Sequence, residues 1–138
     1  MSTYSVTATS KPGGEAHVDV FDRSLRFDAG AERDLIHPGP AELLCAALAA
    51  CLLKNTERYS HILPFRYEAA RVRVEAERQE APPLFTRFTY RLEVVTDEPP
   101  RRVELLHRNV RRYGTVGSTL SLAAEVTGEI IAMEAFDE

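Results

Sequence analysis

The sequence is poor in cysteine, and it lacks a net basic charge, a long apolar run and an internal repeat. Two cysteines among 138 residues do not make a disulfide framework, so nothing requires an oxidising compartment. The formal net charge of −4 argues against non-specific binding to nucleic acid, which needs a basic face. With 44% hydrophobic and 28% charged residues, the composition is that of an ordinary globular protein.

No segment suits a membrane span or an export signal. The longest apolar run, residues 43–53, is too short to cross a bilayer and predicts a buried helix instead. No basic segment followed by an apolar one opens the sequence, so we expect no secretory signal and a cytoplasmic location. The length and the absence of a linker predict one domain over residues 1–138.

Alternating side chains and turn-forming residues predict strands in the N-terminal part. Residues 3–9 and 15–22 are predicted strands, and the turn between them falls at the Pro and Gly residues of 11–14. A short third strand is predicted over residues 25–28, and glycine and proline indicate a loop over residues 28–40.

One long helix is predicted from Pro40 to about His61. Pro40 suits the first turn, where its missing N–H group costs nothing, and Glu42 complements the positive end of the helix dipole. Alanine and leucine fill residues 43–53, which are apolar on every side. One small sheet covers only one side of such a helix, so we expect a second helix or a second copy of the chain to cover the rest.

The remaining sequence predicts two long strands, a second helix and a last strand. Residues 70–78 and 84–94 alternate between apolar and charged side chains, which indicates a half-buried antiparallel pair. A second helix is predicted from about residue 99 to residue 113, with Gly114 as its cap. A turn over residues 117–122 then leads to a strand at about 125–133. This order predicts an α+β fold with helices on one face of an antiparallel sheet.

Both cysteines lie on the first predicted helix, in the segment PAELLCAALAAC. Cys45 and Cys51 are six residues apart, so a rise of ~1.5 Å per residue separates their Cα atoms by roughly 9 Å. A disulfide needs Cα atoms within about 7 Å, which excludes a redox pair within the intact helix. From composition alone, both residues are interpreted as small buried hydrophobic side chains.

Other candidate sites are weaker. No histidine pair has a metal-ligand spacing backed by cysteine or carboxylate, so we expect no metal; His37 lies in the loop before the first helix, and the others are His17, His61 and His107. Ser118 and Ser121 lack a recognisable base partner. The arginines of the second helix are interpreted as a solvated face paired with Glu104 and neighbouring acids; they are Arg101, Arg102, Arg108, Arg111 and Arg112.

Three segments in register resemble the OsmC/Ohr family, the osmotically inducible protein C and organic hydroperoxide resistance proteins. Residues 37–51, HPGPAELLCAALAAC, resemble the family's central helix and the loop before it. Residues 63–75, LPFRYEAARVRVE, resemble the following loop and long strand, and residues 114–120, GTVGSTL, resemble the motif Cys-Pro-Val-x-x-Thr-Leu. The resemblance implies an OsmC-like α+β fold with antiparallel sheets, two main helices and an intertwined homodimer.

The resemblance also implies a chemistry for Cys51. In peroxidase members, the cysteine at this position attacks a hydroperoxide and becomes a sulfenic acid, and a second cysteine then closes a disulfide that external thiols reduce. The thiolate has a basic partner, which in the Ohr branch is an arginine held by a glutamate. We therefore expect a small pocket around Cys51 at the subunit interface, supported by His37, Glu42 and Gly114, with no cofactor.

The sequence departs from this pattern at three places. Gly114 stands where the second cysteine is expected, so the resolving thiol is missing. Ala41 stands at the position of the Ohr glutamate, although Glu42 beside it fits a broader OsmC-like pattern. The N-terminal loop over residues 10–15 offers Lys11 but no arginine.

Two functions follow from the resemblance. One is a thiol-dependent hydroperoxide reductase in oxidative-stress defence, in which Cys51 works alone and a small thiol, another protein or a disulfide across a dimer resolves the sulfenic acid. The alternative is a non-catalytic OsmC-like dimer that binds a small ligand or acts as a scaffold. The first requires a partly exposed Cys51 with a cation nearby, whereas the second predicts a Cys51 sealed among alanine and leucine.

Overall fold

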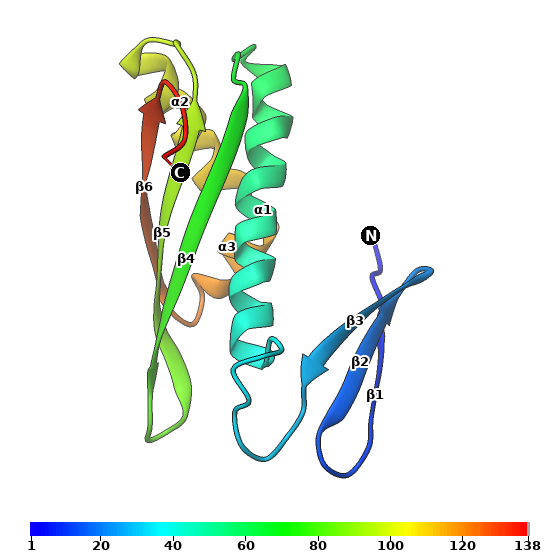
Figure 1. Cartoon of the computed structure of the whole chain (residues 1–138). Helices are drawn as coiled ribbons and strands as arrows, with labels where there is room; N and C mark the ends of the chain where they lie inside the picture. Colours follow the sequence, from blue (N-terminus) through cyan, green and yellow to red (C-terminus); the bar gives the residue numbers. More distant parts are fainter. Residues whose placement is uncertain (138) are drawn as a thin grey trace. The chain divides into compact units, whose positions relative to one another are not determined.

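The computed structural model describes residues 1–137, and the chain divides into two compact units at residues 44 and 45. The first unit holds a three-stranded antiparallel sheet in the order β1 (Thr7–Ser10), β2 (Glu15–Val20) and β3 (Arg23–Asp28) (Figure 1). The predicted strands are confirmed in place. β1 is shorter than predicted. Its first residue, Thr7, pairs with Asp19, and β2 ends only one residue beyond Asp19, at Val20, so it cannot pair with a longer β1.

The turn between β1 and β2 depends on glycine. Gly13 and Gly14 have φ angles of 99° and 93°, in the region that glycine adopts without steric cost. A Cβ on Gly14 would also lie 2.6 Å from the Cα atom of Gly30. Gly14 therefore lets the loop that follows β3 pass close to the turn. The predicted turn at residues 11–14 is confirmed, because β1 ends at Ser10 and β2 begins at Glu15.

α1 (Pro40–Ile62) is one continuous helix, as predicted. The backbone N–H group of Gly39 donates to Oε1 of Glu42 at 2.9 Å, so the glutamate side chain reaches back and caps the residue before the helix. Farther along, the buried residues repeat every four positions and mark one stripe, formed by Leu48, Leu52, Thr56 and Ser60.

The second unit contains a sheet in the order β4 (Ala69–Gln79), β5 (Leu84–Val95) and β6 (Glu125–Met133) (Figure 1). β4 and β5 pair antiparallel, whereas β5 and β6 pair parallel. Between β5 and β6 the chain forms α2 (Pro100–Tyr113) and α3 (Thr115–Leu120). α3 occupies part of the stretch predicted as a turn at residues 117–122.

The α+β fold with two main helices is confirmed, and the parallel pair amends the expected antiparallel sheet. A short turn brings the next strand back antiparallel, as between β4 and β5. A parallel neighbour needs a longer crossover, usually helical, and α2 and α3 provide it between β5 and β6.

The core of the second unit lies between one face of this sheet and the helices. β5 contributes alternate residues from Phe88 to Val94, and α2 contributes Val103, Leu106 and Val110. The opposite face of the sheet carries charged residues in cross-strand ion pairs, such as Arg71 with Glu93 at 2.9 Å. Its charge makes that face a solvated surface.

α1 is only partly covered within one chain. Ala46 and Ala50 are exposed and Leu53 is half-buried, although this segment has no polar side chain to present to solvent. The cover expected on every side of residues 43–53 is therefore incomplete. Among the described residues, no helix is long and apolar enough to cross a membrane.

Candidate functional site

Cys51 lines a pocket of about 340 Å³ within the second unit. Apolar side chains make most of its wall; they are Leu48, Leu52, Val110 and Val126, with Tyr90 beside them. Cys51 is partly exposed and forms no disulfide with Cys45 on the same helix. A molecule that enters the pocket therefore meets the Cys51 thiol.

Gly114 lies directly against Cys51. A Cβ atom at position 114 would be 3.1 Å from Sγ of Cys51, which is tighter than ordinary van der Waals contact. Gly114 follows α2 as predicted, but its φ of −77° is open to any residue, so it is not the left-handed cap that favours glycine at helix ends. A side chain at position 114 would require the Cys51 sulfur to shift by a few tenths of an ångström, so glycine leaves the sulfur its present place. Gly114, one of the predicted pocket residues, does line the pocket.

Asn55 supplies a hydrogen-bond donor to the Cys51 sulfur. Its Nδ2 atom donates to the backbone oxygen of Cys51 at 2.9 Å and lies 3.5 Å from Sγ. Asn55 is one helical turn beyond Cys51 on α1, so the helix itself fixes this contact. Asn55 was not among the predicted site residues. Its position four residues after Cys51 on a predicted helix does indicate that the two side chains are neighbours.

Three arginines of α2 border the same pocket, namely Arg108, Arg111 and Arg112. Their spacing places them on one face of the helix. Arg108 lies 3.8 Å from Glu104, as the predicted solvated face requires. Arg111 and Arg112 form no ion pair with any of the residues 1–137. The sequence showed a basic helix, but not that its basic face borders the thiol.

A part-buried hydrogen bond joins Tyr90, which lines this pocket, to His107 of α2. Oη of Tyr90 lies 2.6 Å from Nε2 of His107, with the two rings edge to face. Burial raises the pKa of Tyr90 to about 12 and lowers the pKa of His107 to about 4, and the positive charge of Arg111 lowers both. At neutral pH His107 is therefore uncharged, and its Nε2 shares a hydrogen bond with the Tyr90 hydroxyl group.

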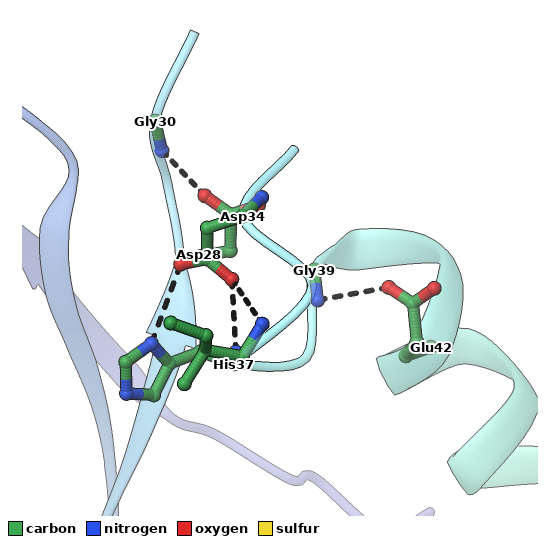
Figure 2. Close-up of polar contacts among 7 residues, drawn as sticks. Asp28, Gly30, Asp34, His37, Gly39 and Glu42 are labelled. Atoms are coloured by element: carbon green, nitrogen blue, oxygen red, sulfur yellow. Dashed lines mark hydrogen bonds and ion pairs between the residues drawn. The ribbon is translucent and has the colours of Figure 1, made fainter. Parts of the chain in front are cut away.

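The predicted residues His37 and Glu42 belong to the first unit. Figure 2 shows the polar contacts that they make in and beside the loop before α1. Glu42 also accepts a hydrogen bond from Arg33 at 2.7 Å, and the pKa of Glu42 is lowered, first by the Gly39 N–H group and further by Arg33. His37 donates its backbone N–H to Asp34 at 2.9 Å and holds its ring 3.3 Å from the same carboxylate. These contacts order the loop before α1.

An arginine held by a glutamate is thus present as Arg33 with Glu42, outside the N-terminal loop of residues 10–15. The side chain of Arg33 remains mostly exposed. The participation of His37 and Glu42 in the Cys51 site stays a prediction.

Comparison with known proteins identifies the family of this chain. The family model of OsmC-like proteins matches residues 30–129. An OsmC-like protein from Mycoplasma pneumoniae shares 14% identity with a TM-score of 0.87, over 96% of this chain and 98% of that one. An organic hydroperoxide resistance protein OsmC from Legionella pneumophila shares 18% with a TM-score of 0.76, over 95% and 99%. The organic hydroperoxide resistance protein OhrB of Bacillus subtilis shares 16% with a TM-score of 0.70, over 92% and 98%.

At these identities the solved structures show a shared fold, and a search of curated proteins found no match. The family model, in contrast, covers most of the sequence, including the Cys51 helix and Gly114. The chain therefore belongs to the OsmC-like family.

Proposed function

We propose that this protein reduces organic hydroperoxides, with Cys51 as its only reacting thiol. The observation that carries the proposal is the partly exposed Cys51 in a pocket bordered by arginines. The volume of about 340 Å³ lies in the range of pockets that hold small organic molecules. A thiol sealed among alanine and leucine, as the non-catalytic alternative predicts, would have no such access.

The reaction begins with the Cys51 thiolate, because the thiolate is the nucleophile. Its sulfur attacks the outer oxygen of R–O–O–H, the O–O bond breaks, and a proton converts the departing alkoxide to R–OH. Cys51 is then oxidised to the sulfenic acid, Cys–S–OH. The Asn55 amide, 3.5 Å from Sγ, supplies a hydrogen-bond donor to the sulfur anion, and the arginines of α2 border the same pocket.

In this proposal an external thiol completes the cycle, because no second thiol of the same chain is placed to resolve the sulfenic acid. Gly114 has no thiol, and Cys45 lies six positions from Cys51 on the same helix. A first external thiol R′–SH displaces water from the sulfenic acid and forms Cys51–S–S–R′. A second R′–SH releases R′–S–S–R′ and restores the Cys51 thiol.

We also propose that the protein works as a homodimer. The half-covered apolar part of α1 supports this, since the resemblance to the family implies that a second chain packs on the central helices. Light scattering at micromolar concentration should give twice the chain mass. A monomeric mass would count against the dimer.

The decisive experiment follows consumption of cumene hydroperoxide with dithiothreitol present, and labelling by a sulfenic-acid trap. Wild type and Cys45→Ser should both consume peroxide and carry one trapped group, while Cys51→Ser should do neither. Labelling at Cys45, or consumption that survives Cys51→Ser, would overturn the proposal. An inert Cys51 in a folded protein would instead favour the non-catalytic ligand-binding dimer, which the missing resolving cysteine already suggests.

A further inference from the structure

Asn55 places a hydrogen-bond donor directly against the Cys51 sulfur, with Nδ2 at 3.5 Å from Sγ. We propose that Asn55 is a catalytic residue, whose amide stabilises the anionic form of the Cys51 sulfur in the place that an arginine takes in the Ohr branch. For the reduction of hydroperoxides this inference rests on the proposed function. For the reactivity of the thiol it rests only on the contacts of the Asn55 amide.

The orientation of the Asn55 amide is fixed by a second hydrogen bond. Nδ2 lies 2.9 Å from the backbone oxygen of Cys51, and that oxygen only accepts hydrogen bonds, so the nitrogen of the amide must face it. An amide nitrogen carries two hydrogens, so the bond to the backbone leaves one hydrogen for Sγ. Because both acceptors belong to Cys51, the donor is in place before the thiol loses its proton.

The arginines beside the pocket act on the sulfur less directly. The side chains of Arg108, Arg111 and Arg112 are exposed, so water and salt screen their charge, and holding a long side chain in one place costs conformational entropy. Within residues 1–137, Asn55 is the side chain that donates a hydrogen bond to Sγ of Cys51. Cys51 also lies about three turns into α1, beyond the first turn in which the helix dipole favours an anion. We therefore expect the amide to outweigh both the arginines and the dipole.

Asn109 on α2 repeats the backbone bond of Asn55 and provides a matched control. Its Nδ2 atom donates at 2.9 Å to the backbone oxygen of Leu105, four residues earlier, as Asn55 donates to Cys51. Both asparagines are half-buried, and among the described residues no sulfur accepts a hydrogen bond from Asn109. Loss of the backbone bond should therefore have a similar effect on stability at both positions, whereas only the change at position 55 should alter the reactivity of Cys51.

The test measures the reaction of Cys51 with iodoacetamide, which reports thiol reactivity without any hydroperoxide; the parent protein is Cys45→Ser, so that one thiol is present. Asn55→Ala should react about fivefold more slowly at pH 7, the effect expected of one hydrogen bond to the sulfur. Asn55→Asp should react more slowly still, because a carboxylate keeps the shape of the amide but brings a negative charge and no donor. Asn109→Ala and Asn109→Asp should keep the parent rate. Salt at 0.5 M should change that rate by less than about twofold, because an amide carries no net charge.

Urea unfolding of the same variants shows that each one is folded, and Asn55→Ala and Asn109→Ala should lose similar unfolding free energy. An unchanged alkylation rate in Asn55→Ala, or an equal slowing in Asn109→Ala, would overturn the inference whether or not Cys51 reduces peroxides. A larger slowing in Arg111→Gln/Arg112→Gln would assign the anion to the arginines and overturn it as well. If the parent consumes cumene hydroperoxide, the rate constant of that reaction should fall by the same factor in Asn55→Ala. If no variant consumes it, slower alkylation still supports the role of Asn55, and only the proposed function fails.

Discussion

Replacing Gly114 by cysteine should join α1 to the end of α2 through a disulfide with Cys51. A Cβ atom at position 114 lies 3.1 Å from Sγ of Cys51. In a disulfide, the Cβ atom of one cysteine lies about 3 Å from the sulfur of the other, as an S–S bond of about 2.04 Å requires. The φ of −77° at position 114 is open to cysteine, so the bond needs little movement of the backbone.

The expected stabilisation follows from the length of chain that the bond closes. A loop of roughly 60 residues corresponds to about 4 kcal/mol of unfolding free energy in the chain-entropy description. Gly114→Ala is the matched control, because its Cβ takes the same position without forming a bond. Crowding against Sγ should then lower the unfolding free energy by about 1 kcal/mol. The same added atom should thus have opposite effects in the two variants.

The measurement combines thiol titration, intact mass and urea unfolding with and without reductant. Oxidised Gly114→Cys should show one titratable thiol, a loss of two hydrogens and a stabilisation that reductant abolishes. Gly117→Cys should keep all three thiols, because position 117 faces Leu48 at 3.8 Å rather than a sulfur. Three thiols in oxidised Gly114→Cys, or a cross-link between two chains instead, would refute the placement of Gly114 against Cys51.

Three further substitutions test the surroundings of the site. The pKa of His107 is about 4 in the folded protein and about 6.5 in the unfolded chain, so the unfolded chain binds more protons between these pH values. The free energy of unfolding is therefore highest above pH 6.5 and falls as the pH approaches 4. Between pH 7 and pH 4.5, urea unfolding of the wild type should show a loss of about 2 kcal/mol of unfolding free energy that His107→Gln lacks. An equal loss in both proteins would contradict the lowered pKa of His107. Gly128→Ala should cost about 2 kcal/mol or more in urea unfolding, since the added Cβ overlaps the ring of Tyr90, and wild-type stability would show that the ring is free to move. Glu42→Ala should lower the thermal midpoint by roughly 3 °C in circular dichroism, whereas Glu42→Gln keeps an acceptor for Gly39; equal midpoints in all three proteins would remove the capping role.

The elements that the sequence predicted correctly are those with local signals. Alternation in β4 and β5, the alanine and leucine content of α1, and the glycines at residues 13–14 each act through neighbouring residues in the chain. The parallel pairing of β6 with β5 has no such signal, because it depends on which strand the chain meets after α2 and α3. An alternating strand has the same pattern in either direction, so periodicity alone does not determine its pairing.

The site was predictable to a similar extent. Resemblance singled out Cys51 and Gly114, but only the fold shows that they touch. A glycine after a helix usually indicates a left-handed cap, and that local explanation fails here because φ at Gly114 is −77°. The feature that favours glycine is instead the Cys51 sulfur of another helix, 3.1 Å from the position of a Cβ atom. The arginine content of α2 was visible in the sequence, whereas the pocket that Arg111 and Arg112 border was not.

The missing side chain at Gly114 ties these features together. A cysteine there would be close enough to capture a sulfenic acid at Cys51 before any external thiol arrived, and it would fill part of the pocket. With glycine, the oxidised sulfur stays open to molecules that enter past the arginines, so the pocket must admit the reductant as well as the hydroperoxide. In peroxide-treated protein, a sulfenic-acid trap should therefore label Cys51 in wild type and fail in Gly114→Cys. Equal labelling of both would show that position 114 does not control the fate of the oxidised sulfur.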